Sequence, residues 1–327
     1  MTTSHALLLE SFGPIPGGLA VREIPTQTPR PGQLLIKMLA APINPADINI
    51  IEGRYGELPP LPAVIGNEGA GIVQEVGPDT PGWQPGDLAV LLKRGSWAEF
   101  VTVPATDAFQ LPPQTDPLLA CQMGVNPPTA LLMLEKFENL QPGDWIAQNA
   151  ANSSVGRCVI QIARDLGLRT INVVRRPELV HDLQALGADV VVTEETDLRN
   201  TVEDLCNGSR PKLALNAVGG ASALNLSNAL APSGTLVTYG AMSKQPLKIP
   251  NGQLIFSDLR FRGFWLTRWK QTATPTEQAT TFQKLIKITA SCHLQLPVQA
   301  SFPIGQFAEA LAEASKPGRT GKVILRL

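Results

Sequence analysis

The sequence contains little of the chemistry on which disulfide frameworks and metal centres depend. Its 327 residues include four cysteines and three histidines. The cysteines are scattered along the chain, with no C-x-x-C pair, at Cys121, Cys158, Cys206 and Cys292. Isolated cysteines of this kind are typical of reduced thiols in a cytosolic protein and not of a disulfide framework. We therefore expect a cytoplasmic protein.

Strong net charge and long apolar runs are also absent. The formal net charge is −1, so no global field attracts nucleic acid or an anionic membrane surface. No apolar run approaches the roughly 18 residues that a membrane-spanning helix needs. The sequence thus predicts neither a nucleic-acid-binding protein nor a membrane protein. Its 43% hydrophobic content is ample for two packed domains.

The stretch from Asp144 to Arg176 has the pattern of a dinucleotide-binding unit. A short apolar run, Trp145 to Ala150, leads into turn residues, and apolar residues with helical spacing then extend from Val155 to Leu166. Gly167 ends that helix, and Arg169 to Val174 is a second apolar run. Strand, tight turn, helix and strand within about 30 residues predict a βαβ unit of the Rossmann type.

The turn after the first strand lacks most glycines of the usual fingerprint. Asn152 and Ser154 stand where glycines would be expected, and Gly156 remains for close helix–strand packing. A helix N-terminus at this point offers N–H donors and partial positive charge to a pyrophosphate. The motif alone leaves open a βαβ unit that binds no ligand.

Two arginines, Arg175 and Arg176, end the second strand. An NAD-binding unit usually carries an acid here for the ribose 2′-OH, whereas an arginine accommodates a 2′-phosphate. The pair therefore favours NADPH as cofactor. An ordinary solvated strand end is the alternative interpretation.

The chain on either side of this unit divides into a β-rich part and a part in which strands and helices alternate. From His5 to Pro112, short strands are separated by Gly and Pro, which predicts an all-β, partly closed barrel. Residues 44–55 interrupt that pattern as a short helix or loop. From Pro128 onward, helices alternate with strands, which predicts a parallel, doubly wound α/β sheet. A last strand at Lys322–Leu327 is expected to rejoin the β domain.

Several segments resemble the medium-chain dehydrogenase/reductase superfamily, among them the GNEGAGIVQEVG run (Gly66–Gly77) and the late dinucleotide unit. Within that superfamily the chain is similar to the 2-enoyl thioester reductases of the mitochondrial type. The segments that carry this resemblance span most of the chain: NPADINIIEGRYG (Asn44–Gly56), LPAVIGNEGAG (Leu61–Gly71), NAANSSVGR to IQIA (Asn149–Ala163), NVVRR (Asn172–Arg176) and GFWLTRWK (Gly263–Lys270).

The resemblance implies a two-domain α/β fold. A Rossmann domain with a doubly wound parallel sheet would occupy residues 126–267. An N-terminal GroES-like β-barrel domain would occupy residues 1–125 and be completed by residues 268–327. The family also implies a homodimer.

The implied activity is NADPH-dependent reduction of the C2=C3 bond of trans-2-enoyl thioesters, with CoA or acyl carrier protein as carrier, in fatty acid biosynthesis. A zinc-independent NADPH quinone or alkenal oxidoreductase is the alternative enzyme. A non-catalytic NADPH-binding protein on the same fold is the alternative of a different class.

No metal is expected. Zinc-dependent relatives hold the ion with Cys and His from the β domain. Asn67 stands where those relatives carry a ligand-bearing histidine, and Asp47 occupies the zone that would carry a cysteine.

Reduction of an activated C=C bond needs a hydride for C3 and a proton for C2, and a tyrosine hydroxyl can supply the proton. The chain has two tyrosines, Tyr55 and Tyr239. The resemblance implies that Tyr55 is the catalytic residue. The alternative is that Tyr55 only packs its loop.

The resemblance also implies cofactor contacts, residue by residue. The nicotinamide would lie near Asn126 and against Phe264, Trp265 and Leu266. The pyrophosphate would meet Asn152, Ser153, Ser154 and Val155, and the 2′-phosphate Arg175 and Arg176. The ribose would be lined by Tyr239, Gly240, Ala241 and Met242, and Lys322 would approach from the C-terminal return. Relatives have an acid between two arginines where this chain has Arg175–Arg176–Pro177, which leaves the role of Arg176 open.

Overall fold

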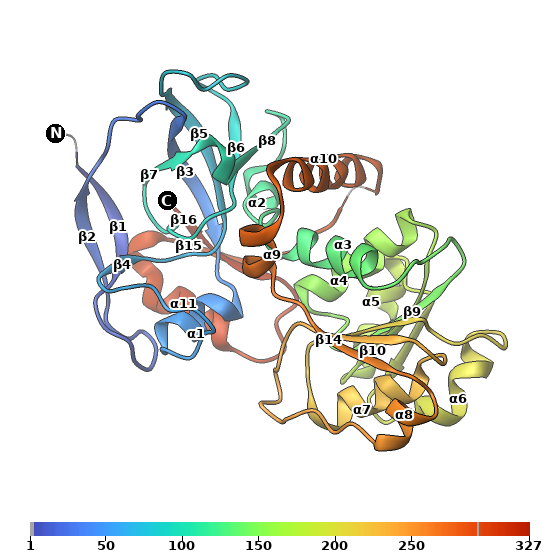
Figure 1. Cartoon of the computed structure of the whole chain (residues 1–327). Coiled ribbons are helices and arrows are strands. Elements are labelled where there is room, and N and C mark those ends of the chain that lie inside the picture. Colours follow the sequence, from blue (N-terminus) through green and yellow to red (C-terminus); the bar gives the residue numbers. More distant parts are fainter. Residues whose placement is uncertain (1–2, 293) are drawn as a thin grey trace. The chain divides into compact units, whose positions relative to one another are not determined.

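A computed structural model describes residues 3–292 and 294–327 (Figure 1). The chain forms two compact units. Unit 1 runs up to Val125 and resumes at Leu296–Leu327, and unit 2 is Asn126–Gln295. The division expected from the sequence returned the chain to the first domain at residue 268. The structure returns it at Leu296, because the long helix α10 (Pro275–Cys292) packs with helices α3 and α4 of unit 2.

Unit 1 contains the GroES-like β domain, built on two sheets. The smaller sheet has the order β2-β1-β4, and the larger has the order β15-β16-β3-β5-β6-β8, with β7 also paired to β3. An isolated antiparallel bridge links Ala6 of β1 to Ala98, just before β7. The strands are β1 (Thr3–Leu9), β2 (Leu19–Pro25), β3 (Gln33–Pro42), β4 (Ala63–Val64), β5 (Gly69–Val76), β6 (Leu88–Leu91), β7 (Phe100–Pro104), β8 (Ala108–Leu111), β15 (Val298–Pro303) and β16 (Lys322–Arg326).

The C-terminal strand completes unit 1, as the sequence predicted: β16 pairs antiparallel with β3. Three helices accompany the sheets, α1 (Pro45–Ile51), α2 (Pro117–Ala120) and α11 (Phe307–Ser315). One face of α1 enters a core with the first strand and the C-terminal elements, which includes Leu7, Ile50, Trp97, Leu311 and Leu325. Burial of these side chains holds α1 and the loop that follows it.

Unit 2 is the doubly wound α/β domain. Its six strands lie in the order β11-β10-β9-β12-β13-β14, and every neighbouring pair is parallel. This order reverses direction between β9 and β12, which is the switch point where Rossmann domains bind dinucleotides. The strands are β9 (Trp145–Gln148), β10 (Arg169–Val174), β11 (Val190–Thr193), β12 (Leu213–Asn216), β13 (Thr235–Thr238) and β14 (Arg260–Gly263).

Helices cover both faces of this sheet (Figure 1). Contacts group α3, α4 and α10 in one layer and α6 with α7 in the other. The helices are α3 (Asn126–Lys136), α4 (Ser154–Asp165), α5 (Val180–Ala185), α6 (Leu198–Leu205), α7 (Gly220–Ala229), α8 (Asn251–Ile255), α9 (Leu266–Thr272) and α10. Within the described part of the chain, no helix combines the length and the apolar character required to cross a membrane.

Candidate active site

The turn between β9 and α4 forms an open helix N-terminus in unit 2. Ser153 is the N-cap, and its hydroxyl accepts a hydrogen bond from the Gly156 N–H at 3.1 Å. Among the described residues, the N–H groups of Ser154 and Val155 have no hydrogen-bond partner. Gly156 is required for this geometry, because a Cβ there would come within 2.5 Å of the Ala151 carbonyl oxygen. The free N–H groups and the helix dipole suit an anion.

Buried amides under α4 fix this turn. The Gln148 side chain, fully buried in β9, donates to the Gly156 carbonyl at 2.9 Å and to the Asn172 side chain at 2.8 Å. Asn172 in turn donates to the Thr170 hydroxyl at 2.8 Å. Such bonds are strong constraints on position because unmade buried hydrogen bonds are costly. Sequence analysis did not identify these amides, although polar side chains within apolar strands were the available signal.

A second pair of buried amides lies at the carboxyl ends of β9 and β12. Asn149 donates to Asn216 at 2.9 Å and accepts from the Ala217 N–H at 2.7 Å. The Asn216 side-chain oxygen also accepts from the N–H groups of Val218 and Gly219 at 3.1 and 3.0 Å. These bonds fix the loop after β12 at the switch point. They too were missed by the sequence analysis.

The predicted ribose-lining run follows β13 directly. The Tyr239 hydroxyl is buried and faces Ser153 without a hydrogen bond of regular geometry, and burial raises the pKa of Tyr239 above its ordinary value. Gly240 lies close to the segment that follows β12, because a Cβ there would lie 2.9 Å from the Ala217 carbonyl oxygen. Met242 is exposed. The structure therefore brings Tyr239 and Ser153, both predicted site residues, together at the α4 N-terminus.

The two arginines after β10 have different surroundings. Arg175 is exposed, and no side-chain partner is found for it among the described residues. Arg176 is half-buried and lies 3.7 Å from the Glu178 carboxylate. Glu178 thus supplies an acid near Arg176 although the acid between the arginines is missing. Arg175 is the more available of the two for a phosphate.

The predicted nicotinamide wall begins helix α9. The Phe264 ring meets the Phe137 ring edge-to-face at 6.0 Å between centroids, Trp265 is the N-cap of α9, and Leu266 is buried. Asn126, 6% exposed, begins α3. Strand β14 ends at Gly263, and helix α9, which the sequence analysis did not predict, begins at Leu266.

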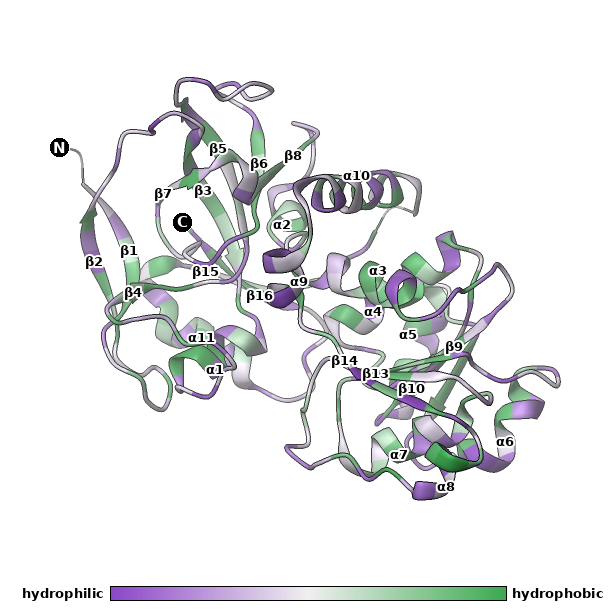
Figure 2. Cartoon of the chain, in the orientation of Figure 1, coloured by the Kyte–Doolittle hydropathy of each residue, from purple (hydrophilic) through white to green (hydrophobic). Residues whose placement is uncertain are grey.

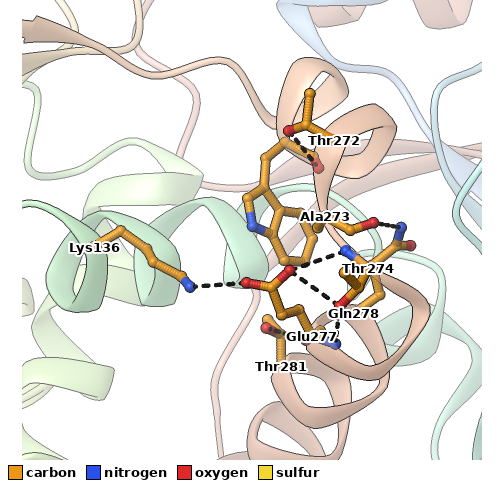
Figure 3. A network of polar contacts seen from close by, with 8 residues as sticks. Lys136, Thr272, Ala273, Thr274, Glu277, Gln278 and Thr281 are labelled. Carbon is orange, nitrogen blue, oxygen red and sulfur yellow. Dashed lines mark hydrogen bonds and ion pairs between the residues drawn. The ribbon is translucent and has the colours of Figure 1, made fainter.

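Polar contacts fix the joint between α9 and α10 (Figure 3). The Glu277 carboxylate accepts from the Thr274 N–H at 2.9 Å and from its hydroxyl at 3.1 Å, and lies 3.7 Å from the Lys136 ammonium on α3. The Thr274 bonds hold the pKa of Glu277 below its ordinary value. The Gln278 amide donates to the Lys270 carbonyl at 2.9 Å. These contacts hold the helix that carries the predicted wall.

In unit 1, Tyr55 lies in the loop after α1. The chain leaves the helix through Gly53, whose φ is +71°, and the Arg54 N–H donates to the Asn49 carbonyl at 2.7 Å. The Tyr55 side chain is half-buried against the core that contains Ile50 and Trp97. The ring is therefore held while its surroundings remain accessible to solvent.

The segments that hold zinc in relatives are joined here by hydrogen bonds. The buried Asp47 carboxylate accepts from the Asn67 side chain at 2.6 Å and from its N–H at 3.0 Å. The Lys322 ammonium donates to the Asn44 side chain, and the Asn44 amide donates to Glu68 at 2.8 Å. The predicted cofactor residue Lys322 is thus buried in this cluster. Carboxylates, amides and an ammonium are a poor donor set for zinc.

Known proteins resemble both units and the whole chain. Residues 30–113 match the alcohol dehydrogenase GroES-like domain, and residues 154–283 match the zinc-binding dehydrogenase family. The mitochondrial enoyl-[acyl-carrier-protein] reductase of rat is 45% identical over 302 residues, which cover 89% of this chain and 80% of the rat protein.

Two solved structures cover essentially the whole chain. Etr1p, the 2-enoyl thioester reductase of Candida tropicalis, in complex with NADP and crotonyl-CoA, is 28% identical with a TM-score of 0.89 and covers 100% of both chains. A mycobacterial quinone oxidoreductase is 26% identical with a TM-score of 0.87, covering 99% of this chain and 100% of the other.

The sheet order, the open α4 N-terminus and these matches define a medium-chain dehydrogenase/reductase. Within that superfamily the chain belongs to the family of the 2-enoyl thioester reductases, as its resemblance predicted. The expected cytoplasmic location is wrong, because the rat and human relatives are named as mitochondrial enzymes. Scattered cysteines without a disulfide framework do not distinguish one reducing compartment from another.

Proposed function

We propose that the protein reduces the C2=C3 bond of trans-2-enoyl thioesters with NADPH, with the acyl group carried on CoA or acyl carrier protein. The observation that carries this proposal is the α4 N-terminus, open at Ser154 and Val155, beside a second strand, β10, that is followed directly by Arg175. The names of the rat relative and of the crotonyl-CoA complex give the substrate class. A place in fatty acid synthesis follows from that chemistry.

The residues of unit 2 fit NADPH. Free N–H groups at Ser154 and Val155 would bind the pyrophosphate, and the exposed Arg175 would bind the 2′-phosphate. The unpartnered Tyr239 hydroxyl beside Ser153 is a buried polar atom that a ribose or phosphate oxygen would satisfy. Bound NADPH supplies the hydride that reaches C3.

Tyr55 is proposed to supply the proton for C2. A phenol donates at neutral pH, and the half-buried ring is held by core packing while solvent can restore its proton. The other tyrosine, Tyr239, belongs to the cofactor cradle of unit 2. The remaining predicted contacts, at Asn126, Phe264 to Leu266 and Lys322, are part of this proposal.

Turnover of matched acceptors tests the function. With NADPH, we expect crotonyl-CoA to give a kcat/KM at least tenfold above that of a small quinone, because the thioester is the acceptor of the relatives. A quinone preferred over every enoyl thioester would replace the proposal by the alternative that the mycobacterial structure represents. If the protein consumes no NADPH with either acceptor, only an NADPH-binding role would remain.

We also infer that two copies form a homodimer through the outer edge of unit 2. Strand β14 is the last strand of its sheet, and open edges invite pairing with another chain. The neighbouring segment exposes three consecutive apolar side chains, Leu254 (47% exposed), Ile255 (69%) and Phe256 (86%). Figure 2 shows the green of α8 at the lower border of unit 2. Antiparallel pairing of two β14 strands about a two-fold axis would cover both features.

Light scattering of a charge-insertion variant tests the dimer. Ile255→Glu combined with Phe256→Glu should convert a dimer to a monomer. Leu58→Glu, at an exposed leucine of unit 1, should leave the dimer intact. A monomeric wild-type protein, or a double variant that remains dimeric, would contradict the inference.

A further inference from the structure

The Asp47 carboxylate connects two segments of unit 1 that are far apart in sequence. It is fully buried at the third position of α1 and accepts the Asn44 N–H at 2.7 Å, which is half of a capping box. Its other oxygen accepts both the N–H and the side-chain amide of Asn67, in the loop before β5. Three donors therefore converge on one carboxylate.

The identity of this residue is constrained by those donors. An asparagine at position 47 would keep the shape, but its NH₂ group would face an N–H donor of Asn44 or Asn67. At least one buried hydrogen bond would then be replaced by a contact between donors, which is the costly case. An ionised carboxylate is the group that accepts hydrogen bonds from all three donors.

The cluster around Asp47 reaches the C-terminal strand of unit 1 and two further segments of that unit. Asn44 donates to Glu68 at 2.8 Å, and Lys322 on β16 donates to Asn44. The other Glu68 oxygen accepts the Gly124 N–H at 2.9 Å. The start of α1 is thus fixed to β16, to the loop before β5 and to the chain near Gly124.

We propose that Asp47 is a positioning residue for the reduction: by linking the N-terminus of α1 to the loop before β5, it fixes the far end of α1, from which the Tyr55 loop departs. The inference rests on the proposed role of Tyr55. In zinc-dependent relatives a metal ion joins these two zones, and here hydrogen bonds to a carboxylate do so.

The path from Asp47 to Tyr55 is short and stiff. Helix α1 has seven residues and ends in two further bonds, from the Gly53 N–H to Ile50 at 2.9 Å and from the Arg54 N–H to Asn49 at 2.7 Å. A tilt at the N-terminus of so short a helix moves its C-terminal loop. Displacing a reacting group by about 1 Å can reduce the rate about a hundredfold.

Protonation of Asp47 would weaken the same contacts. Burial raises the pKa of Asp47 to about 7, an effect increased by Glu68 and opposed by the Asn44 and Asn67 N–H groups and by Lys322. Two further titratable side chains face this cluster. The Arg94 guanidinium lies 3.5 Å from the Asn67 side-chain oxygen. The buried Cys121 thiol is close enough to Glu68 and Lys322 to feel their charge, and burial raises its pKa well above the ordinary value. A protonated carboxyl would direct an O–H at an N–H donor, so the anchored state requires the ionised form.

Steady-state kinetics of Asp47→Asn test the proposal. We expect kcat for crotonyl-CoA to fall at least tenfold while the dissociation constant for NADPH is unchanged. The wild-type kcat should fall as the pH drops below about 7, and this acid limb should be absent in Asp47→Asn. Asp87→Asn is the matched control, because buried Asp87 caps a turn of the same unit by accepting the Gln84 N–H at 2.8 Å. Its kcat should stay within twofold of wild type even if the melting temperature falls equally.

A double variant separates the two proposals. If Asp47 acts through Tyr55, Tyr55→Phe/Asp47→Asn should be no slower than Tyr55→Phe alone. Additive losses, or a kcat of Asp47→Asn within twofold of wild type, would overturn the role of Asp47 and leave that of Tyr55 standing. A fully active Tyr55→Phe would remove both. If Asp47→Asn does not fold, Asn67→Ala, which loses one of the three donors, serves in the same cycle with a smaller expected loss.

Discussion

The N-termini of two helices, α4 in unit 2 and α1 in unit 1, meet negative charge in opposite ways. At α4 the cap is the neutral hydroxyl of Ser153, and the N–H groups of Ser154 and Val155 remain free among the described residues. At α1 the chain's own carboxylate, Asp47, is buried against the Asn44 and Asn67 donors.

The N-terminus of α4 is therefore suited to binding a ligand, whereas that of α1 serves to fix the backbone. A helix N-terminus attracts an anion because its N–H groups lack partners and its dipole is positive there. Where the chain supplies the anion, as with Asp47, the attraction fixes the backbone. Where the chain supplies no anion, as at Ser154, the helix N-terminus can attract an anionic ligand instead.

The largest expected effect concerns α1, the helix at which the chain's own Asp47 supplies the negative charge. Because burial raises the pKa of Asp47 to about 7 from 3.8, the native state binds more protons than the unfolded state between these values. The free energy of unfolding attributable to this group therefore decreases as the pH rises through that window, and the loss is complete above about 7. Between pH 5 and pH 8 the wild type should lose about 3 kcal/mol relative to Asp47→Asn, at 1.36 kcal/mol per unit.

Urea unfolding of both proteins at the two pH values measures this difference. Parallel pH dependences would show that Asp47 does not titrate in this range. Together with the kinetics, the result would show whether ionisation of Asp47 lowers stability while it raises kcat, a conflict that is common at functional sites.

A negative charge introduced at the N-terminus of α4 should abolish most of the affinity for NADPH. Ser154→Asp places a charge at the first position of α4, where acids normally stabilise a helix, so the melting temperature should not fall. NADPH should bind about a hundredfold more weakly, because a like charge near a phosphate costs a few kcal/mol even with strong screening. Fluorescence titration with NADPH measures this, with Ser154→Asn as the neutral control. Unchanged affinity would mean that the pyrophosphate lies elsewhere.

The sequence predicted α4 and its flanking strands well, and the surroundings of α1 poorly. Apolar runs around residues 144–176 have the correct periods for β9, α4 and β10, and all three elements are local. The Asp47 cluster joins residues 44, 47, 67, 68 and 322, which become neighbours through strand pairing that no local pattern specifies. Helix α9 was missed because Phe264 and Trp265 favour strands, whereas a contact with α10, from the Gln278 amide to the Lys270 carbonyl, stabilises a helix from Leu266.

A smaller effect is expected at the arginines beside the open helix. Arg175→Ala should reduce the preference for NADPH over NADH about tenfold to a hundredfold, the value of a charge-assisted bond of roughly 1.5–3 kcal/mol. Arg176→Ala should change it less, because Arg176 already lies near Glu178. The ratio of kcat/KM for the two cofactors measures both. Equal values for the two cofactors in the wild type would remove the assignment to NADPH.

No effect is expected from removal of metal. Among the described residues, no His, Cys, Asp and Glu side chains gather into a group that could hold a metal ion, so the purified protein should contain no stoichiometric zinc and should keep full activity in chelator. Elemental analysis that finds about one zinc per chain, lost together with activity, would contradict this prediction.

The most direct test of the account is the kcat of Tyr55→Phe with NADPH and crotonyl-CoA. The substitution removes one hydroxyl and keeps the ring that packs against the core of unit 1. A positioned general acid contributes about 10²- to 10⁴-fold in rate, whereas an ordinary hydrogen bond contributes about 0.5–1.5 kcal/mol. We predict a fall in kcat of at least a hundredfold with an unchanged NADPH dissociation constant. A loss below about tenfold, or one confined to KM, would show that Tyr55 does not donate the proton.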